Sequence, residues 1–347
     1  MELKQDIRLL SKVKLQELMT SLGEAKFRAN QVYEWLWKKS ASSFDEMSNL
    51  SLELRSKLSE NFELRKLDED LVQHSNDGTI KTRFALHDNS KIESVLIPVP
   101  DDKRFTVCVS SQVGCSLSCA FCATGKMKRI RNLDPGEIYD QVVLVNEQSI
   151  ERFGHGLTNV VYMGMGEPLL NYANVMKSIK LLSSPDGLHM SAKRFTISTA
   201  GIAKMIKKLA DDESKVNLAL SLHAADDVKR NEIMPINEQN NLESLMEALT
   251  YYYNITKNKI SYEYITFQGF NDSIEDADNL AKLCSKFPVR VNIIEYNPIA
   301  GFDMIKSSKD TIDEFAIRLR SKGIMVTVRR SRGKDIDAAC GQLANKE

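Results

Sequence analysis

Three cysteines lie close together in the stretch GCSLSCAFCATG, residues 114–125. Cys115, Cys119 and Cys122 have C-x₃-C-x₂-C spacing, and soft thiolates at such short intervals usually bind a metal centre. A tetrahedral zinc site takes four ligands, and so does a cubane of four irons. The identity of the fourth ligand therefore decides what chemistry this stretch performs.

Three arrangements are compatible with the cysteine spacing. Cys108 completes a structural Cys₄ zinc site, although such sites usually pair two tight cysteine knuckles and only one triple is present here. Cys108 or Cys340 supplies the fourth ligand of an electron-transfer cluster. In the third arrangement the cubane has three protein thiolates, and its fourth iron is open to a small chelating molecule. We favour the third, because the triple follows the first strand of a strand–helix repeat and Gly114 and Gly125 flank it.

Strand and helix patterns alternate in the second part of the chain. Strand-like runs are predicted at 105–110, 159–164, 194–199, 216–223, 260–267, 289–296 and 325–330. Helical patterns occupy 135–148, 172–183, 202–211, 241–253, 274–286 and 310–322. This alternation predicts an α/β fold with a parallel sheet, curled into a partial (β/α) barrel or left partly open.

Polar residues of unusual type follow several of these strands, where active sites form in such folds. We expect the following residues to share one pocket: Cys115–Cys122, Gly166, Glu167, Ser198, His223, Asn297 and Arg329–Arg332.

The chain before the barrel has two further patterns. Helical spacing over 14–39 and 44–62, with Ser42 and Ser43 as candidate caps and no strand pattern, predicts a small helical domain at 1–70. Its aromatic and basic residues either face a polyanion, as in an accessory RNA-binding domain, or pack in the core, and the spacing of Trp35 and Trp37 favours the core. Two alternating runs around residues 88–90 predict a β-hairpin extension at 71–103, which leaves 104–347 for the barrel.

The composition of the chain limits which partners it can bind and indicates the cellular compartment in which it works. Lys+Arg and Asp+Glu are both 47, so nucleic-acid binding requires local basic patches. Two such runs flank the proposed chemistry: Lys126, Lys128, Arg129 and Arg131, and Arg329, Arg330, Arg332 and Lys334. The charged N-terminus, the lack of a long apolar run and the clustered cysteines predict a cytoplasmic protein with no membrane partner.

Seven ordered motifs resemble those of the radical S-adenosylmethionine enzymes and, among these, the RlmN/Cfr family of RNA adenine methyltransferases. They are CVSSQVGCSLSCAFCATG, YMGMGEPLLNY, FTISTAGI, LALSLHA, MPIN, VNIIEYNP and VRRSRGKDIDAACGQL, and the resemblance covers nearly all of residues 80–343. It implies a radical S-adenosylmethionine core that carries one [4Fe-4S] cluster per chain on Cys115, Cys119 and Cys122, with S-adenosyl-L-methionine on the open iron.

The resemblance also implies a role for individual residues. Cys340 matches the S-methylcysteine intermediate, Cys108 the residue that resolves it through a transient disulfide, and Glu93 the proton acceptor. The positions that match the S-adenosylmethionine-binding residues are Gly166, Glu167, Ser198, Ser221, Leu222, His223 and Asn297.

The implied activity is methylation of carbon 2 of adenosine, both in the peptidyl-transferase centre of 23S rRNA and 3′ of the anticodon in tRNA. Reduced flavodoxin or ferredoxin is the implied electron donor, and the enzyme is expected to be a monomer. One alternative is Cfr-type methylation of carbon 8, which is disfavoured because that group has GEA where this chain has Gly166-Glu167-Pro168. The other alternative is a zinc-stabilised RNA-binding protein.

Overall fold

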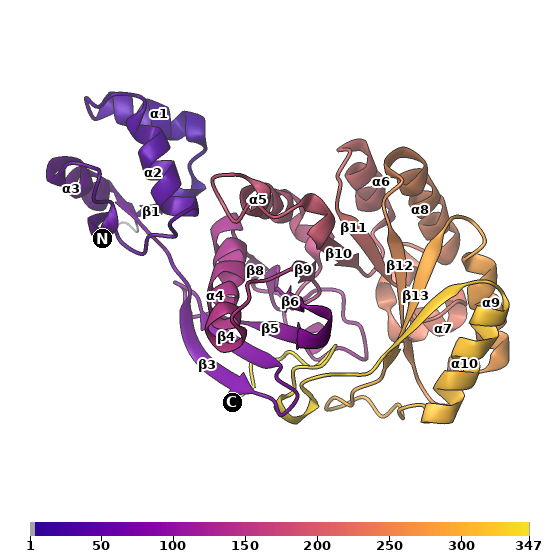
Figure 1. Cartoon of the computed structure of the whole chain (residues 1–347). Coiled ribbons are helices and arrows are strands. Elements are labelled where there is room, and N and C mark those ends of the chain that lie inside the picture. The colour runs from indigo at the N-terminus through magenta and orange to yellow at the C-terminus, as the bar shows by residue number, and fades with distance from the viewer. Residues whose placement is uncertain (1–3, 347) are drawn as a thin grey trace.

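A curved, open sheet organises the computed structural model, which describes residues 4–346. Within these residues ten strands pair in the order β14-β13-β12-β11-β10-β9-β6-β5-β4-β3 (Figure 1). The strands from β6 to β14 in this order run parallel, which confirms the predicted partial barrel. Their bounds are β6 (Arg104–Cys108), β9 (Asn159–Tyr162), β10 (Phe195–Thr199), β11 (Asn217–Ser221), β12 (Ile260–Thr266), β13 (Val289–Glu295) and β14 (Met325–Arg329).

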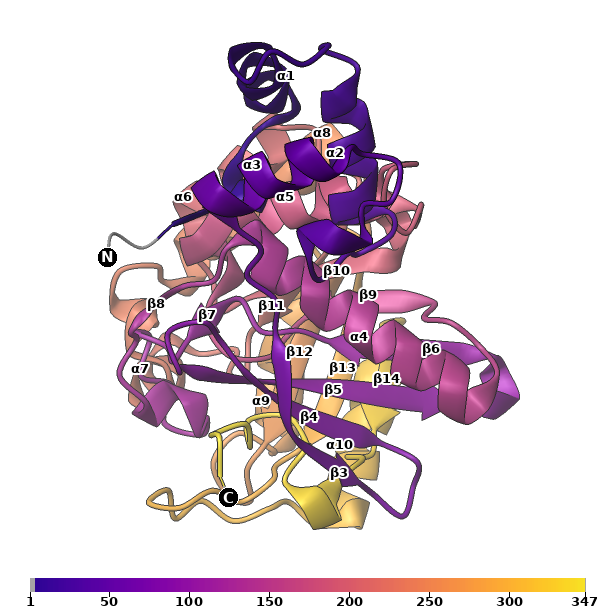
Figure 2. The same ribbon diagram turned by 90° about the vertical axis from the view of Figure 1, so that its left-hand side faces the viewer.

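Helices connect successive parallel strands and lie along the outside of the sheet (Figures 1 and 2). The predicted helices are all present: α4 (Pro135–Phe153), α5 (Tyr172–Ser183), α6 (Ala203–Asp211), α8 (Leu242–Thr256), α9 (Ile274–Leu283) and α10 (Lys309–Ser321). The prediction missed α7 (Asp227–Ile233), a short helix whose buried residues are Arg230 and Ile233. Its apolar face is too small to give a helical pattern.

Three antiparallel strands extend the sheet beyond β6. They are β3 (Asp68–His74), β4 (Ile80–Ala85) and β5 (Lys91–Val99), and β5 pairs with β6. The predicted hairpin is the β4–β5 pair, whose turn contains Asn89 in the left-handed region (φ 61°). The third strand, β3, carries polar residues at most positions, and for this reason the alternation did not reveal it.

The N-terminal region is mainly helical, as predicted. It contains α1 (Lys12–Ser21), α2 (Arg28–Trp37) and α3 (Leu52–Asn61), together with β1 (Gln5–Asp6) and β2 (Phe62–Glu63), a short parallel pair that the sequence did not indicate. Ser11 and Ser51 are the caps of α1 and α3. Of the proposed caps, Ser43 is the N-cap residue of a 3₁₀ turn, Phe44–Glu46, but its side chain makes no capping bond. The hydroxyls of Ser42 and Ser43 donate to Glu46.

Helix α4 holds this region against the rest of the chain. Arg8 Nη1 lies 2.7 Å from Asp140 Oδ2, and both side chains are buried. The ring of Trp37 packs edge-on against Tyr139 at 5.1 Å between centroids. Trp37 is therefore a core residue, as its spacing suggested, whereas Trp35 is half-buried and lies beneath the Lys39 ammonium.

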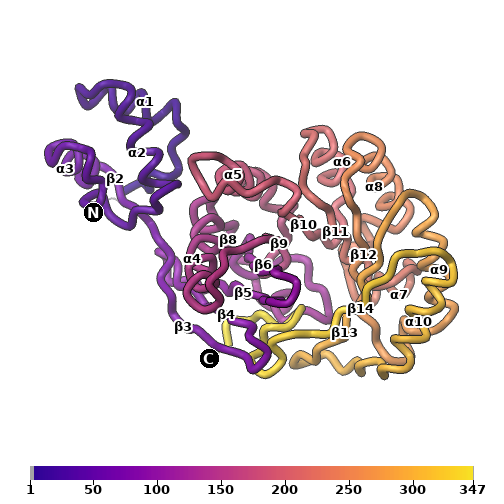
Figure 3. Tube along the Cα trace, viewed as in Figure 1, coloured from indigo at the N-terminus to yellow at the C-terminus, as the bar shows by residue number. Residues whose placement is uncertain are grey.

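The chain returns across the sheet after β14. Its last residues reach β4, where Arg83 Nη1 donates to the carbonyl oxygens of Asn345 (3.2 Å) and Lys346 (2.9 Å). Figure 3 shows this yellow segment running from the side of β14 toward β3. Of the helices formed by residues 4–346, none combines the length and the apolar character that a bilayer crossing requires.

Candidate active site

The cysteine triple lies in a loop that begins shortly after β6. Two short strands, β7 (Gln112–Val113) and β8 (Arg131–Asn132), pair antiparallel and close its base. Gly114 has φ 73°, and a Cβ atom there would overlap the carbonyl of Lys128. A Cβ on Gly125 would lie 2.8 Å from the carbonyl oxygen of Cys119. Both glycines are therefore required for the loop to close on itself.

The three thiols of this loop influence one another. Burial raises the pKa of Cys115 to about 11, and it also raises the pKa of Cys119 and Cys122. After burial, the neighbouring thiols of Cys122 and Cys115 raise the pKa of Cys119 further, so the three groups lie near one another. Metal binding at this loop would displace protons from all three thiols.

The donor set of this loop suits an iron–sulfur cluster. Among residues 4–346, no three His, Cys, Asp or Glu side chains are grouped closely enough to hold one metal ion. A cubane of four irons is larger and takes thiols that lie further apart. A hollow of about 500 Å³ lies on one side of the loop, and of the three cysteines only Cys115 lines it. Three thiols near one another are the donor set of a [4Fe-4S] cluster with one open iron, so the residues present fit such a cluster.

Two further thiols, 232 positions apart in the numbering (340 − 108), are neighbours at the end of β6. Burial raises the pKa of Cys108 to about 12, and the second cause of this shift is the thiol of Cys340. Burial also raises the pKa of Cys340, whose residue nevertheless remains exposed to solvent. Cys122 is also close enough to affect Cys340. The structure thus brings the two proposed catalytic cysteines together beside the three-cysteine loop, residues 114–130, which we call the cluster loop.

Hydrogen bonds hold the C-terminal segment on the cluster loop. The amide of Ala123 donates to the carbonyl of Gly341 (2.7 Å), and Thr124 Oγ1 donates to the carbonyl of Leu343 (2.6 Å). Asn297, one of the predicted cofactor-binding residues, donates from Nδ2 to the carbonyl of Cys340 at 3.4 Å. Asn297 therefore contributes to the position of Cys340.

Glu295, at the end of β13, binds three cations from the chain that follows. Its carboxylate lies 2.8 Å from Arg330, 2.9 Å from Lys334 and 3.2 Å from Lys306. Burial alone would raise the pKa of Glu295, but hydrogen bonds from these cations outweigh it and lower the pKa to about 2. Glu295 thereby orders the segment that leads to Cys340.

Most cations of the two basic runs bind protein groups. In the first run, Arg131 pairs with Asp88 (2.6 Å) and Glu137 (2.8 Å), and Lys126 donates to the carbonyl of Ala300 (2.8 Å). In the second run, Arg330 and Lys334 bind Glu295, while Arg332 donates to the carbonyl of Pro98 (2.9 Å). These residues hold the loop and the C-terminal segment in place. The sequence shows only that the cations are adjacent along the chain, so it could not predict their protein partners.

Glu93, the predicted proton acceptor, is buried in β5. Its Oε2 accepts hydrogen bonds from the amides of Ala344 (2.9 Å) and Asn345 (3.1 Å), and Lys81 Nζ lies 3.5 Å from its Oε1. In this structure the carboxylate of Glu93 anchors the end of the chain a few residues after Cys340.

Gly166 and Glu167 follow β9. Gly166 has φ 95°, and a Cβ there would lie 2.5 Å from the side chain of Gln112, so packing within the protein already explains this glycine. The buried Glu167 carboxylate accepts from the amides of Ala200 (2.8 Å) and Leu169 (3.0 Å). Burial raises the pKa of Glu167 to about 7 in spite of these hydrogen bonds.

Four predicted cofactor-binding residues lie at the carboxyl ends of β10 and β11. The hydroxyls of Ser198 and Ser221 are 3.4 Å apart, and the amide of the buried Leu222 donates to the carbonyl of Glu263 at 3.0 Å. His223 is buried with φ 56°, and its Nδ1 accepts from the amide of Ile265 at 3.1 Å. Burial and, secondarily, Arg230 lower the pKa of His223 to about 3, so the ring is neutral.

Arg230 stabilises this region, and its role was not predicted from the sequence. It is completely buried in α7 and donates to the carbonyls of Ala200 (2.6 Å), Leu222 (3.0 Å) and Ser221 (3.2 Å) and to Asn237 Oδ1 (2.5 Å). It therefore fixes the chain just after β10 and β11. The motif MPIN was the feature of the sequence that could have indicated this contact, since it contains Asn237, a partner of Arg230.

Comparisons with known proteins agree with this geometry. Residues 6–64 match the ribosomal RNA large subunit methyltransferase N-terminal domain, and residues 109–283 match the radical SAM superfamily. The chain is 56% identical to a probable dual-specificity RNA methyltransferase RlmN from Cytophaga hutchinsonii, covering 99% of this chain and 94% of the relative. It is 42% identical to a dual-specificity RNA methyltransferase RlmN from Nautilia profundicola, with 96% of each chain covered.

A solved structure has the same fold from end to end. The radical SAM methyltransferase from Sphaerobacter thermophilus superposes with a TM-score of 0.92 at 39% identity, covering 99% of this chain and all of the other. The cysteine loop, the open parallel sheet and the paired thiols thus occur in a chain whose relatives match it over nearly their full length. This protein belongs to the RlmN family of radical S-adenosylmethionine RNA methyltransferases.

Proposed function

We propose that this enzyme methylates carbon 2 of adenosine in the peptidyl-transferase centre of 23S rRNA and at the position 3′ of the anticodon in tRNA. The proximity of Cys108 and Cys340 beside the three-cysteine loop carries the proposal, because this chemistry needs one sulfur to carry the methyl group and another to release the product. The names of the relatives, dual-specificity RNA methyltransferases, support two RNA substrates.

Cys115, Cys119 and Cys122 would hold the [4Fe-4S] cluster, with Gly166, Glu167, Ser198, Ser221, Leu222, His223 and Asn297 around S-adenosylmethionine. When bound, the cluster and S-adenosylmethionine supply a 5′-deoxyadenosyl radical. The neutral ring of His223 and the paired serine hydroxyls offer uncharged hydrogen-bonding groups to a nucleoside.

Cys340 would accept a methyl group on its sulfur, lose one hydrogen atom from that methyl group to the radical, and add through the resulting methylene to carbon 2. The adduct would then lose one electron, to the oxidised cluster, and the proton on carbon 2, which Glu93 would take. Cys108, as a thiolate, would attack the sulfur of Cys340, so that a disulfide forms, the carbon–sulfur bond breaks and the released carbon takes up a proton to become the methyl group. Because Glu93 binds the amides of Ala344 and Asn345, its role as a base requires the end of the chain to move away.

The remaining assignments follow from this chemistry. The cycle consumes electrons, so a reduced flavodoxin or ferredoxin is the proposed donor, and the disulfide requires re-reduction in a cytoplasmic environment. We further propose that the enzyme acts as a monomer and that residues 1–70 form an accessory RNA-binding domain, followed by the extension at 71–103 and the catalytic domain at 104–347. The match of residues 6–64 to a methyltransferase N-terminal domain supports the first of these boundaries.

Mass spectrometry of nucleosides from ribosomal and transfer RNA, with and without the gene, tests the function. We expect 2-methyladenosine to disappear from both RNAs when the gene is deleted. Loss of 8-methyladenosine instead would support the Cfr-type activity. Iron and sulfide in the anaerobically purified protein are expected, whereas one zinc per chain and no iron would contradict the proposal.

A further inference from the structure

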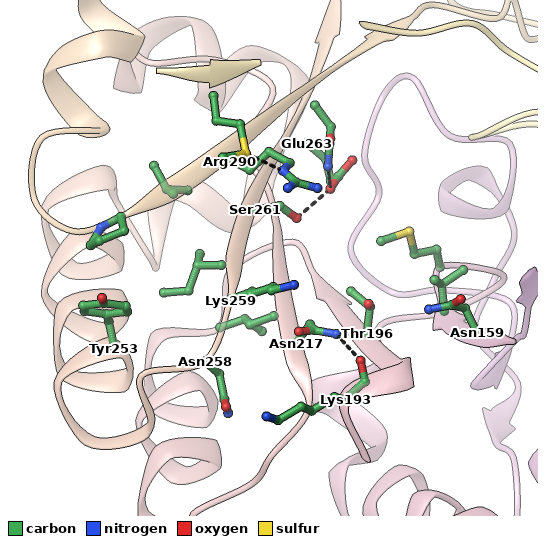
Figure 4. Close-up of a pocket in the computed structure, with 18 of the residues that line it drawn as sticks. Asn159, Lys193, Thr196, Asn217, Tyr253, Asn258, Lys259, Ser261, Glu263 and Arg290 are labelled. Atoms are coloured by element: carbon green, nitrogen blue, oxygen red, sulfur yellow. Dashed lines mark hydrogen bonds between the residues drawn. The ribbon is translucent and has the colours of Figure 1, made fainter. Parts of the chain in front are cut away.

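A second hollow lies inside the curved sheet, on the side away from the cluster loop. Its volume is about 700 Å³, and residues from the amino-terminal halves of β9 to β14 form much of its lining. Glu263 within β12, Met163 after β9 and Arg329 at the end of β14 line it as well, and the proposed cofactor residues lie toward the carboxyl ends of the strands. Figure 4 shows Glu263 and Ser261 toward one end of this cavity and Lys193 and Asn258 toward the other. The volume is sufficient for a nucleoside.

The lining of this cavity is strongly basic. It includes six cations, Lys193, Arg194, Lys257, Lys259, Arg290 and Arg329, and among its described residues Glu263 is the one acid. All six cationic residues are exposed. A basic rim around a concave site concentrates polyanions, and RNA phosphates are the polyanion of this enzyme family.

Glu263 has an unusual environment for a carboxylate. Its residue is 3% exposed, and its Oε1 accepts hydrogen bonds from Asn292 Nδ2 (2.7 Å) and Ser261 Oγ (2.8 Å). Its Oε2 is buried and has no hydrogen-bond partner among the described residues. Arg329 Nη1, at 3.7 Å from Oε2, is within ion-pair range but too far for a hydrogen bond. A buried carboxylate oxygen without a donor is destabilising, so a ligand that supplies one would be bound there favourably.

The inner end of the cavity lies next to the proposed S-adenosylmethionine site, since the carbonyl of Glu263 accepts from the amides of Leu222 (3.0 Å) and His223 (3.2 Å). Glu263 and Arg329 both lie close enough to Cys340 to influence its thiol. Met163, which lines the cavity, has a backbone amide that hydrogen-bonds Cys108. Glu263 also pairs across the sheet with Ser221, on the strand that leads to the proposed S-adenosylmethionine site. The inner end of the cavity therefore lies beside the strand and loop that we propose hold S-adenosylmethionine, with Cys340 near enough for Glu263 and Arg329 to affect its pKa.

We propose that this cavity receives the adenine that leaves its stack in the RNA, and that Oε2 of Glu263 recognises the exocyclic amino group of that base. This inference rests on the proposed function. The amino group is a donor, as the free carboxylate oxygen requires, whereas a carbonyl at that position of a purine would face the carboxylate with a second acceptor. Only one ring nitrogen separates the amino-bearing carbon from carbon 2, so a group that fixes the amine also fixes the methylated carbon.

Two RNA substrates test this recognition with the holoenzyme. One contains adenosine at the target position, and the other contains purine riboside, which lacks the amino group but keeps carbon 2. We expect the wild-type enzyme to prefer adenosine by roughly 10- to 100-fold in kcat/KM, because a hydrogen bond to a charged group is lost with purine riboside. Equal rates on the two RNAs would overturn the inference without any variant being made.

Glu263→Gln tests the same recognition by changing the protein. In one orientation the glutamine NH₂ group faces the amino group of adenine, so that two donors oppose each other. In the other orientation the NH₂ group faces Ser261 and Asn292, and their hydrogen bonds to Oε1 are lost. We expect this variant to lose most of the preference for adenosine, because the ratio of kcat/KM on the two RNAs cancels any effect of the substitution on steps that both substrates share. Retention of the full preference would contradict the proposal. Ser261→Ala removes one hydrogen-bond donor to the Glu263 carboxylate and is expected to weaken the preference for adenosine partially. This variant replaces Glu263→Gln in the test if Glu263→Gln does not fold.

Asp276→Asn is the control, since it makes the same chemical change in a buried carboxylate that caps α9 and pairs with Lys229. It is expected to keep the wild-type preference. The two proposals fail in different ways. If the wild-type enzyme methylates neither RNA at carbon 2, the proposed function is wrong. If it methylates both RNAs equally well, only the recognition by Glu263 is wrong.

Discussion

At the scale of single residues, the site depends on side chains whose ordinary chemistry has been changed by burial. Cys108 and Cys340 are thiols held beside one another, and burial keeps the pKa of both above the usual value. Protonated thiols are poor nucleophiles, so the pair remains unreactive until a cation or the reaction itself generates a thiolate. Among the residues that the structure describes, Arg329 is the cation that lowers the pKa of Cys340 and so favours its thiolate.

Cys108→Ala is predicted to trap the RNA on Cys340, because no second sulfur is then available to displace the product. A covalent adduct should accumulate and appear on a denaturing gel as a slow band that nuclease removes. Cys284→Ala is the control, since Cys284 caps the end of α9 through its backbone amide and its thiol has no role in the proposed chemistry, and this variant should release product normally. Normal release of methylated RNA by Cys108→Ala would show that Cys108 does not resolve the intermediate.

His223→Asn is predicted to make folding less sensitive to acid. The pKa of His223 falls from 6.5 in the unfolded chain to about 3 in the folded protein, so the unfolded chain binds a proton that the folded one excludes. Folding stability is therefore complete above pH 6.5 and declines as the pH falls toward 3, by at most about 1.4 kcal/mol per pH unit. Asparagine retains an acceptor for Ile265 and tolerates the positive φ, but it does not titrate.

Urea unfolding of both proteins at pH 4.5, 5.5, 6.5 and 7.5, followed by tryptophan fluorescence, measures this effect. The free energy of unfolding should fall more steeply for the wild type than for His223→Asn below pH 6.5, and both should change in parallel above it. Parallel behaviour at every pH would mean that His223 can bind a proton in the folded state.

At the scale of elements, the cluster loop and the C-terminal segment depend on each other. The loop offers the amide of Ala123 and the hydroxyl of Thr124 to the carbonyls of Gly341 and Leu343. Glu295 and Glu93 hold the same segment from β13 and β5. Two of these contacts come from the loop itself and the others from two strands, so a change in the loop is expected to be transmitted to Cys340.

Gly125→Ala is predicted to reduce cluster loading to less than half of the wild-type value. Its Cβ would lie 2.8 Å and 3.0 Å from backbone atoms of Cys119, so the loop must shift and the thiols with it. Iron and sulfide per chain after anaerobic purification give the measurement. Gly154→Ala is the control: it has a positive φ at the end of α4 and no atom within 4 Å, so it should lower stability by about 1 kcal/mol without changing the iron content. Full loading of Gly125→Ala would show that the loop tolerates the displacement.

At the scale of the whole molecule, a buried ion pair joins the N-terminal helices to the catalytic sheet. Arg8 pairs with both Asp6 and Asp140, and Lys66 reaches the second oxygen of Asp140 at 3.1 Å. The two domains that we propose are thus attached through α4, which also supports the cluster loop at its first turn through the pair of Glu137 with Arg131. Loosening this attachment should affect stability more than chemistry.

Asp140→Asn is predicted to lower the free energy of unfolding by about 3 kcal/mol, because it leaves Arg8 buried with one partner instead of two. Limited proteolysis should cut the chain faster near residues 62–68, between the two parts. Asp186→Asn is the control, since Asp186 pairs with Lys12 on the surface at 3.6 Å, and its effect should stay within about 0.5 kcal/mol. Equal stability of Asp140→Asn and the wild type would mean that the attachment rests on the packing of Trp37 and Tyr139 alone.

The sequence by itself determined the parallel sheet, the helices that connect its strands and the three-cysteine motif to which we assign the cluster. These features depend on local spacing: apolar periodicity for strands and helices, and a short cysteine motif for the loop. The strand β3 and the helix α7 escaped this reasoning because their faces are mostly polar and tertiary contacts stabilise them.

Only the tertiary structure decided which distant residues meet. The nearness of Cys108 to Cys340, the contact of Glu93 with the end of the chain and the buried position of Arg230 follow from how the sheet curves and how the C-terminal segment returns across it. Glu263 was indistinguishable from a solvated strand residue in the sequence, since a free carboxylate oxygen becomes significant only when it is enclosed. Local patterns specify elements, whereas burial and long-range pairing determine the chemistry of each side chain.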